Sequence, residues 1–298
     1  FSGLHKKVSS ALDMIGRENG LARYHNALTN YVLMVMMFAT GYRAVSSPIA
    51  RDSDLNFQAG FLVISDKTDI KQCHSHIVPI CKTLARQLTT YRAHCDWVAR
   101  QLSDTGEFRW KDPSDRPVLF YLSEQTLAAE ECRPKTMVEK LSRDYCLPLN
   151  LNRHWLRGSL RKRNVPGEYV DAFMGHWALG SDPFGRYSAM DPQHYRQKVA
   201  KAVEKLLKNL DVECAPVVPA VRNALLALKE DARDDTISIP RHMRKHSGEL
   251  LGDRARTENQ RRKHERLRFR VEQILTECWP GFSDKKPSLV MKQAVLDQ

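Results

Sequence analysis

The sequence lacks any hydrophobic run long enough to cross a membrane. Its longest apolar stretch, "YVLMVMMFA", is far shorter than the roughly 20 residues that a spanning helix needs. No signal peptide is recognisable, and the chain begins at Phe1 instead of methionine, so we expect a fragment of a longer protein. A hydrophobic content of 42% and a charged content of 28% are typical of a soluble globular protein. We expect no membrane-spanning segment and, once the motifs below are included, no membrane partner.

The sequence also lacks a cysteine framework. Its seven cysteines are an odd number and include no Cys-x-x-Cys pair, which argues against structural disulfides and favours a reducing compartment. The segment "CHSHIVPIC" resembles a metal site most closely. However, His74 and His76 alternate as on a strand, and no second ligand pair has finger-like spacing. We expect neither a metal nor any other cofactor.

Acidic residues are scarce relative to basic ones. With 47 Lys and Arg against 35 Asp and Glu, the chain has a formal net charge of +12. A polyanion gains counterion-release free energy on such a surface, so nucleic acid is the leading partner. An acidic membrane surface is the second candidate, and a basic protein with no such partner is the third.

Helices dominate the periodic segments. Gly41 ends a helix at Leu21–Ala39, and two strands at Phe61–Ser65 and Cys73–Ile80 flank a polar turn. A long amphipathic helix follows, and then an apolar "VLFYLS". Further helices are expected at Lys135–Tyr145, Asn152–Arg163, Gly167–Gly175 and in "PQHYRQKVAKAVEKLL". The predicted fold class is mainly α with a small antiparallel β-sheet, without repeats or an alternating strand-helix series.

The composition and apolar periodicity of the chain change near residue 212. "DVECAPVVPA" is expected to be a linker, because it holds two prolines and few periodic apolar residues. A helical stretch at Val221–Asp231 follows. Arg241–Arg270 then carries eleven Lys and Arg against four Asp and Glu, a local net charge of +7. We expect domains at 1–211 and 212–298, the second basic and mostly helical.

Five short motifs in the first domain form a candidate phosphate site. His154 and Arg157 are three residues apart on a predicted helix and project from one face. Arginine is a bidentate donor suited to phosphate, and histidine can transfer a proton near neutral pH. The other members are Arg43 in "ATGYR", Lys67 in the predicted turn, His176 after Gly175, and Tyr187 beyond a Pro-Phe-Gly turn. No acid pair, glycine-rich phosphate loop or Ser/His/Asp order competes with this set.

In this order, the motifs resemble those of the tyrosine recombinase, or phage integrase, family over about Leu21–Tyr195. "ATGYRAVSSPIARDSDLN" is similar to the first arginine motif, "ISDKTDIKQCHSHIVPI" to the lysine hairpin, "HWLR" to the His-x-x-Arg box and "MGHWALGSDPFGRYS" to the Gly-His…Tyr end. Three positions after the first arginine, where the family usually has an acidic residue, this chain has Ser46. Pro183 lies in a slightly long interval between His176 and Tyr187. The resemblance is therefore to a divergent branch.

The resemblance implies a catalytic domain at 1–211 with a C-terminal extension, and the separate N-terminal DNA-binding domain of the family is missing from this fragment. It implies a site-specific recombinase or integrase of a mobile element, which forms a covalent 3′-phosphotyrosine without ATP or metal. The implied nucleophile is Tyr187, with Tyr195 as its rival. Arg43 and Arg157 would clamp the phosphate, with His154 as base, Lys67 (or Lys71) as acid and His176 as a further donor.

The implied partners are a double-stranded DNA site, a tetramer of protomers on two duplexes, and accessory DNA-bending or directionality proteins. The implied location is the cytoplasm, on the nucleoid. Two alternatives stay open at this point. A type IB topoisomerase uses a similar set of residues, although the histidine of "HWLR" favours a recombinase. A catalytically inactive relative that only binds DNA is the other.

Overall fold

The structure is a computed structural model that describes residues 1–43, 55–57, 60–65, 75–103, 117–141, 148, 150–176, 183–184 and 190–234. The chain divides into two compact units. The first comprises Phe1–Thr68 and His76–Leu225, and the second comprises Asp69–Ser75 and Leu226–Gln298. Residues 75 and 226–234 are the described part of the second unit.

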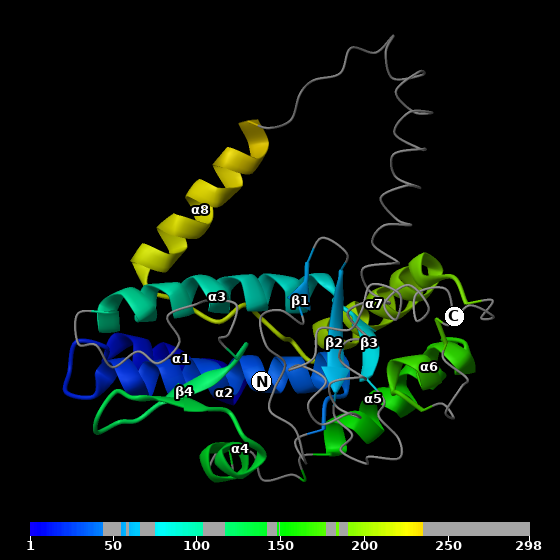
Figure 1. Ribbon diagram of the computed structural model, residues 1–298, viewed down its shortest axis with the longest axis horizontal. Helices are drawn as coiled ribbons and strands as arrows, with labels where there is room; N and C mark the ends of the chain where they lie inside the picture. The colour runs from blue at the N-terminus through cyan, green and yellow to red at the C-terminus, as the bar shows by residue number, and fades with distance from the viewer. Residues whose placement is uncertain are drawn as a thin grey trace, which may run out of the picture. The chain divides into compact units, whose positions relative to one another are not determined.

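The described part of the chain is mainly helical with a small antiparallel sheet component, as predicted (Figure 1). The helices are α1 (Ser2–Asp13), α2 (Gly20–Thr40), α3 (Lys82–Ser103), α4 (Pro134–Leu141), α5 (Leu151–Lys162), α6 (Gly167–Phe173), α7 (Pro192–Asn209) and α8 (Pro219–Asp234). The strands are β1 (Leu55–Asn56), β2 (Phe61–Ser65), β3 (Ser75–Pro79), β4 (Phe120–Leu122) and β5 (Ala129–Glu131).

The strands form two small sheets. In the first, β2 lies between β1 and β3, and β1 pairs antiparallel to β2 with Leu55 opposite Leu62. In the second, β4 and β5 pair antiparallel with Tyr121 opposite Glu130. The predicted strand at Phe61–Ser65 is confirmed, and the one predicted at Cys73–Ile80 is β3.

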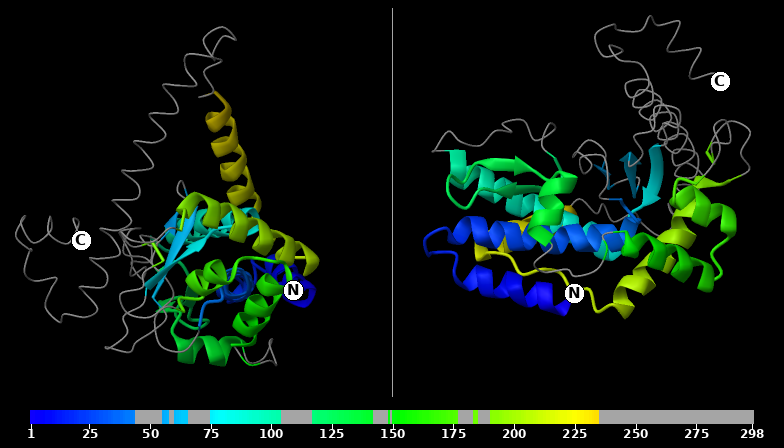
Figure 2. Two further views of the ribbon diagram at one scale, coloured as in Figure 1. Left: turned by 90° about the vertical axis from the view of Figure 1, so that its right-hand side faces the viewer. Right: turned by 90° about the horizontal axis from the view of Figure 1, so that it is seen from below.

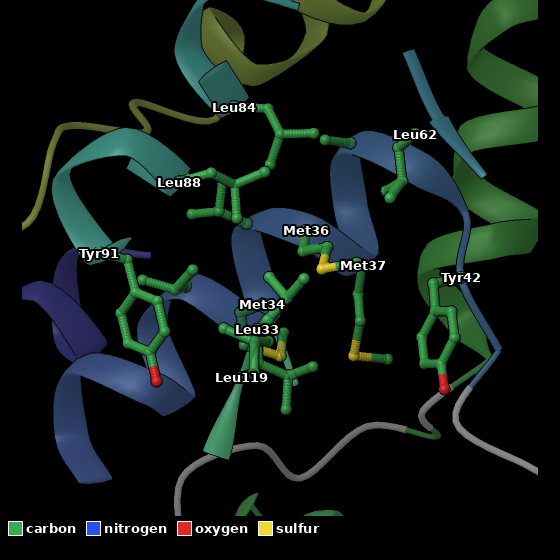
Figure 3. Close-up of a cluster of buried hydrophobic side chains, with 14 of the residues drawn as sticks. Leu33, Met34, Met36, Met37, Tyr42, Leu62, Leu84, Leu88, Tyr91 and Leu119 are labelled. Atoms are coloured by element: carbon green, nitrogen blue, oxygen red, sulfur yellow. The ribbon is translucent and has the colours of Figure 1, made fainter. Parts of the chain in front are cut away.

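Helix α2 is the centre of the first unit. It packs against α1 and α3, which lie beside it (Figures 1 and 2), and also contacts β4, α5 and α7. Its apolar run is buried: Leu33, Met36 and Met37 meet Leu84 and Leu88 of α3 in the cluster of Figure 3. The run that was too short for a membrane is therefore a core helix, apolar on nearly every side. Among the described residues, no helix has the length and apolar character that crossing a bilayer requires.

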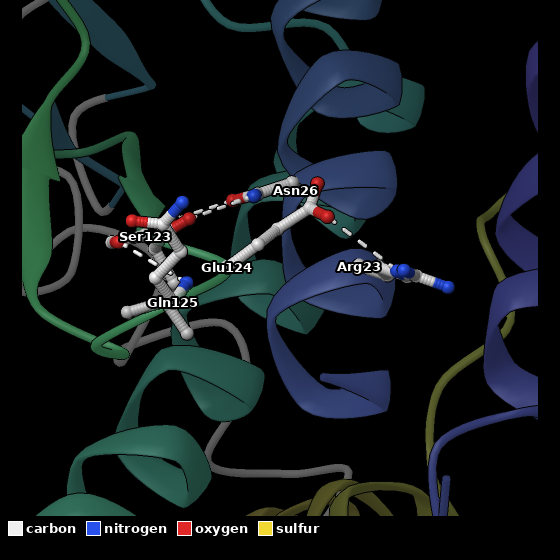
Figure 4. Close-up of polar contacts among 6 residues, drawn as sticks. Arg23, Asn26, Ser123, Glu124 and Gln125 are labelled. Atoms are coloured by element: carbon white, nitrogen blue, oxygen red, sulfur yellow. Dashed lines mark hydrogen bonds and ion pairs between the residues drawn. The ribbon is translucent and has the colours of Figure 1, made fainter. Parts of the chain in front are cut away.

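Polar side chains of α2 hold the second sheet. The Asn26 amide donates to the Leu122 carbonyl and accepts from the Leu122 N–H, both at 2.8 Å, and Arg23 pairs with Glu124 in the adjoining turn at 3.5 Å (Figure 4). The Tyr121 hydroxyl donates to Asn30 at 2.8 Å. Because a short two-stranded ribbon is marginal alone, these bonds fix it to the helix.

The segment expected to be a linker packs against the core instead. Val212, Ala215, Val217 and Val218 are buried. The hydroxyls of Tyr24 and Tyr31 donate to the carbonyls of Pro216 (3.0 Å) and Glu213 (2.6 Å), and the Ala215 N–H donates to Gln87 at 3.0 Å. The linker prediction was therefore wrong, because the first unit continues through this segment to Leu225. We call residues 212–218 the strap.

A buried histidine pair joins α2 to α3. His25 Nε2 donates to the Phe120 carbonyl at 2.9 Å, so the neutral ring accepts at Nδ1 from His94 Nε2, 3.1 Å away. Both rings have no exposed surface. Burial lowers the pKa of His25 to about 4, and burial together with the neighbouring His25 lowers the pKa of His94 well below its usual value. Protonating His25 would place a proton on Nδ1, opposite the Nε2–H of His94.

Acid should therefore destabilise the fold before the carboxylates titrate. In an unfolded chain His25 takes up a proton near pH 6.5, whereas in the folded chain it stays neutral to about pH 4. The unfolded state binds more protons in that window, so the free energy of unfolding falls as the pH falls, by up to about 3 kcal/mol from His25 alone. Urea unfolding at several pH values measures this slope.

Two variants separate this effect from general acid sensitivity. His25→Gln should be less stable at pH 7 but lose stability with a shallower slope between pH 6.5 and 4. His194→Gln, which changes an exposed histidine of α7, should keep the wild-type slope. Equal slopes in wild type and His25→Gln would contradict the prediction.

Candidate functional site

The first arginine motif lies at the end of α2. Gly41 adopts a left-handed conformation (φ +67°), and its N–H donates to the Met37 carbonyl at 3.0 Å, which closes the helix. Glycine adopts this conformation without strain, so the predicted breaker is confirmed at this position. Arg43 follows two residues later and is half-buried.

The Gly-His motif lies at the end of α6 and has the hydrogen bonds of a Schellman cap. The His176 N–H donates to the Asp171 carbonyl at 2.8 Å, and the Gly175 N–H donates to the Ala172 carbonyl at 3.2 Å. Gly175 has φ +62°, and a Cβ added there would lie 2.9 Å from Nδ1 of His76. The cap therefore needs glycine for both its backbone and its close neighbour. It leaves His176 half-buried directly after the helix.

Strand β3 of the predicted lysine hairpin meets the same cap. His76 of β3 is buried, and its ring lies against Gly175. Lys67 and its alternative Lys71 both belong to the segment between β2 and β3, and both lie outside the described residues. The strand that ends this hairpin is therefore in contact with the Gly-His turn.

The start of α5 joins the first and last of these motifs. Asn152 is buried, and its amide donates to the carbonyls of Met37 (2.7 Å) and Tyr42 (3.4 Å) at the end of α2. Arg153 is also buried: Nη1 donates to the Gly41 carbonyl at 2.9 Å, while Nη2 donates to the Met174 carbonyl and to Nε2 of His176, 3.2 Å away. Two adjacent residues thus connect three of the motifs.

The predicted pair on α5 has a different environment. His154 is exposed, and Arg157 is partly exposed, with 39% of its side chain accessible. Arg157 Nη2 lies 3.5 Å from Oδ1 of Asp171 on α6, which is an ion pair rather than a well-formed hydrogen bond. The guanidinium has five donors, so this contact leaves donors for an anion.

Of the two candidate tyrosines, the structure describes only Tyr195. Tyr187 lies outside the described residues. Tyr195 lies in α7 with no exposed surface, and its hydroxyl donates to the Ile77 carbonyl at 2.9 Å. Burial raises the pKa of Tyr195 well above its usual value. A nucleophile must reach its substrate and lose its proton, and Tyr195 meets neither condition.

Metal ligands do not gather in the described part of the chain. No three histidine, cysteine or acidic side chains there are close enough to hold an ion. Cys73 and His74 lie outside the described residues, whereas His76 belongs to strand β3 as expected. The chemistry of the described site is that of guanidinium and imidazole donors.

Sequence reasoning missed Asn152 and Arg153. Adjacent residues on a helix lie about 100° apart, so Arg153 cannot share a face with His154 and must point elsewhere. Carbonyls at a glycine-capped helix end need donors, but the sequence alone does not show that α5 begins beside two such ends. No protein-family model matches the chain, and no curated protein matches it either.

Proposed function

We propose that this chain is the catalytic part of a tyrosine recombinase, which cuts and rejoins DNA through a covalent 3′-phosphotyrosine. One observation carries the proposal. The motifs that contain Arg43, His154, Arg157 and His176 are far apart in sequence, yet Asn152 and Arg153 bind the first to the last, and His76 brings the hairpin strand to the same turn. Residues that must act on one phosphate require such a convergence.

The proposed reaction uses Tyr187 as its nucleophile, and proton transfers by two other side chains accompany it. The oxygen of Tyr187 attacks the scissile phosphorus, a Tyr–O–P bond forms, and the bond from phosphorus to the 5′ oxygen breaks. The tyrosine proton goes to His154, whose exposed position on α5 leaves it accessible to substrate. Lys67 gives a proton to the departing 5′ oxygen. Attack by a 5′-hydroxyl reverses these steps and rejoins the strand.

The transition state carries extra negative charge, which two arginines are suited to bind. Arg157 is partly exposed and lies in an ion pair with Asp171, and its remaining donors can reach a non-bridging oxygen. Arg43 follows a rigid glycine cap that Asn152 and Arg153 hold from α5. The net charge of +12 favours association with the DNA backbone.

The test is covalent trapping on nicked DNA. The substrate is a pool of duplexes with randomised sequence around a nick. Cleavage near the nick releases a short strand that carries the 5′-hydroxyl, so the strand cannot be rejoined and an active recombinase stays covalently attached. We expect a denaturation-resistant adduct, a peptide containing Tyr187 with the DNA remnant, and an enriched sequence among the recovered strands. DNA binding without any adduct would favour the inactive relative. Relaxation of supercoiled plasmids regardless of sequence would favour the type IB topoisomerase.

A further inference from the structure

Arg153 is a buried cation whose charge faces two helix ends. The residue is 6% exposed, and an unbalanced charge in such a place is costly. The carbonyls that it binds, those of Gly41 and Met174, lie at the C-terminal ends of α2 and α6. Carbonyls at helix ends have no partner within the helix and carry the negative end of the helix dipole. The guanidinium therefore satisfies both ends at once and is stabilised by them.

The third contact of Arg153 determines where His176 carries its proton. A guanidinium donates hydrogen bonds and accepts none, so Nε2 of His176 must be the acceptor of the 3.2 Å contact. The proton of the neutral imidazole then lies on Nδ1. A ring in this state can donate to an anion through Nδ1 and not through Nε2.

We propose that Arg153 is a positioning residue that sets the tautomer of His176. It also holds the end of α2, just before Arg43, at a fixed distance from the cap formed by Gly175 and His176. The consequence for catalysis rests on the proposed function: His176 would donate to the phosphate through Nδ1–H, from a ring whose other nitrogen is held by Arg153. The tautomer itself follows from the contact between Arg153 and Nε2 of His176. The two parts can therefore fail separately.

The first measurement is the tautomer. Long-range proton–nitrogen correlation spectra of protein labelled with ¹⁵N-histidine distinguish Nδ1–H from Nε2–H rings, and the His176 signals are identified by their loss in His176→Gln. We expect Nδ1–H in the wild type. Arg153→Lys keeps the charge but not the forked geometry, and it should abolish that preference. Arg161→Lys, which changes an exposed arginine of the same helix, should leave the His176 signals unchanged.

The second measurement is covalent trapping with the same variants. Because small misplacements of a positioning group slow chemistry strongly, Arg153→Lys should reduce the trapping rate about 10- to 100-fold. DNA affinity should stay within about threefold, since Arg153 is buried and donates to protein groups of the core. Trapping by Arg161→Lys should match the wild type in rate.

An Nε2–H proton on His176 in the wild type, or an unchanged tautomer in a folded Arg153→Lys, would overturn the inference. If wild type formed no adduct but showed the Nδ1–H ring, the proposed function would fail while the positioning role stood. Should Arg153→Lys fail to fold, the wild-type tautomer still decides the matter, because it needs no variant.

Discussion

Tyr187→Phe is expected to abolish the covalent protein–DNA adduct on nicked duplexes while leaving DNA binding unchanged. The substitution removes one oxygen, which is the atom that attacks phosphorus in the proposed reaction. We expect at least a thousandfold loss, to the detection limit of a denaturing gel, because removal of a nucleophile eliminates the covalent route. Fluorescence anisotropy with the same duplex measures binding in parallel.

Tyr195→Phe is the matched control. Its hydroxyl donates to the Ile77 carbonyl in the core, so the variant should lose about 1–2 kcal/mol of unfolding free energy but form the adduct at the wild-type rate. The Phe61, Tyr169 and Phe184 rings around it accommodate a phenyl ring. An adduct that persists in Tyr187→Phe and disappears in Tyr195→Phe would reverse the assignment.

Local signals predicted most of the described helices well. Helix α2 combines apolar spacing with a glycine at its end, and both features act within a few residues of the chain. Asp191 and Pro192 do the same at the start of α7, where the aspartate accepts from the Gln193 N–H at 2.9 Å. Helix α1 went unpredicted. It buries only Val8 and Ala11, too few apolar positions to give a clear period.

Burial of polar groups could not be predicted in the same way. Asn152 and Arg153 are buried because α5 begins beside the ends of α2 and α6, and that proximity is a property of the whole unit. The same holds for His25 and His94, which meet across 69 residues of chain. In sequence, each is an ordinary polar residue on a helix. Only the tertiary arrangement turns it into a donor for a particular carbonyl or ring.

The strap shows the same limit in an extended segment. The two prolines of "DVECAPVVPA" and its lack of a regular spacing of apolar residues are also what a linker would have. Two of the hydrogen bonds that hold the strap are accepted by its backbone carbonyls, and such bonds leave no pattern in its own side chains. Those carbonyls accept from Tyr24 and Tyr31, which lie 192 and 182 residues earlier in the chain. The predicted division into domains at 1–211 and 212–298 thus assigned a piece of the core to the extension.

Deleting residues 211–298 is consequently expected to prevent folding, whereas deleting residues 235–298 is not. The longer deletion removes buried Val212, Ala215, Val217, Val218 and Val221 and leaves the hydroxyls of two buried tyrosines without their acceptors. Burial of one such side chain contributes roughly 1.5–3 kcal/mol for valine, so the combined loss rivals the total stability of a typical domain, about 5–15 kcal/mol. Thermal unfolding followed by circular dichroism measures both deletions.

The shorter deletion then allows a clean test of the basic segment, because it keeps every contact described for residues 1–234. It removes Arg241–Arg270, whose net charge is +7. Each phosphate contact contributes about −0.9 to the slope of log affinity against log salt concentration, so several lost contacts should make that slope visibly shallower. A slope equal to that of the full chain would mean that Arg241–Arg270 does not touch phosphate, and a contact between subunits would then explain its charge better.

The outcome that would contradict the folding prediction is a cooperative melt of the 211–298 deletion at the wild-type temperature. It would show that the strap contributes nothing to the stability of the core, although its valines are buried.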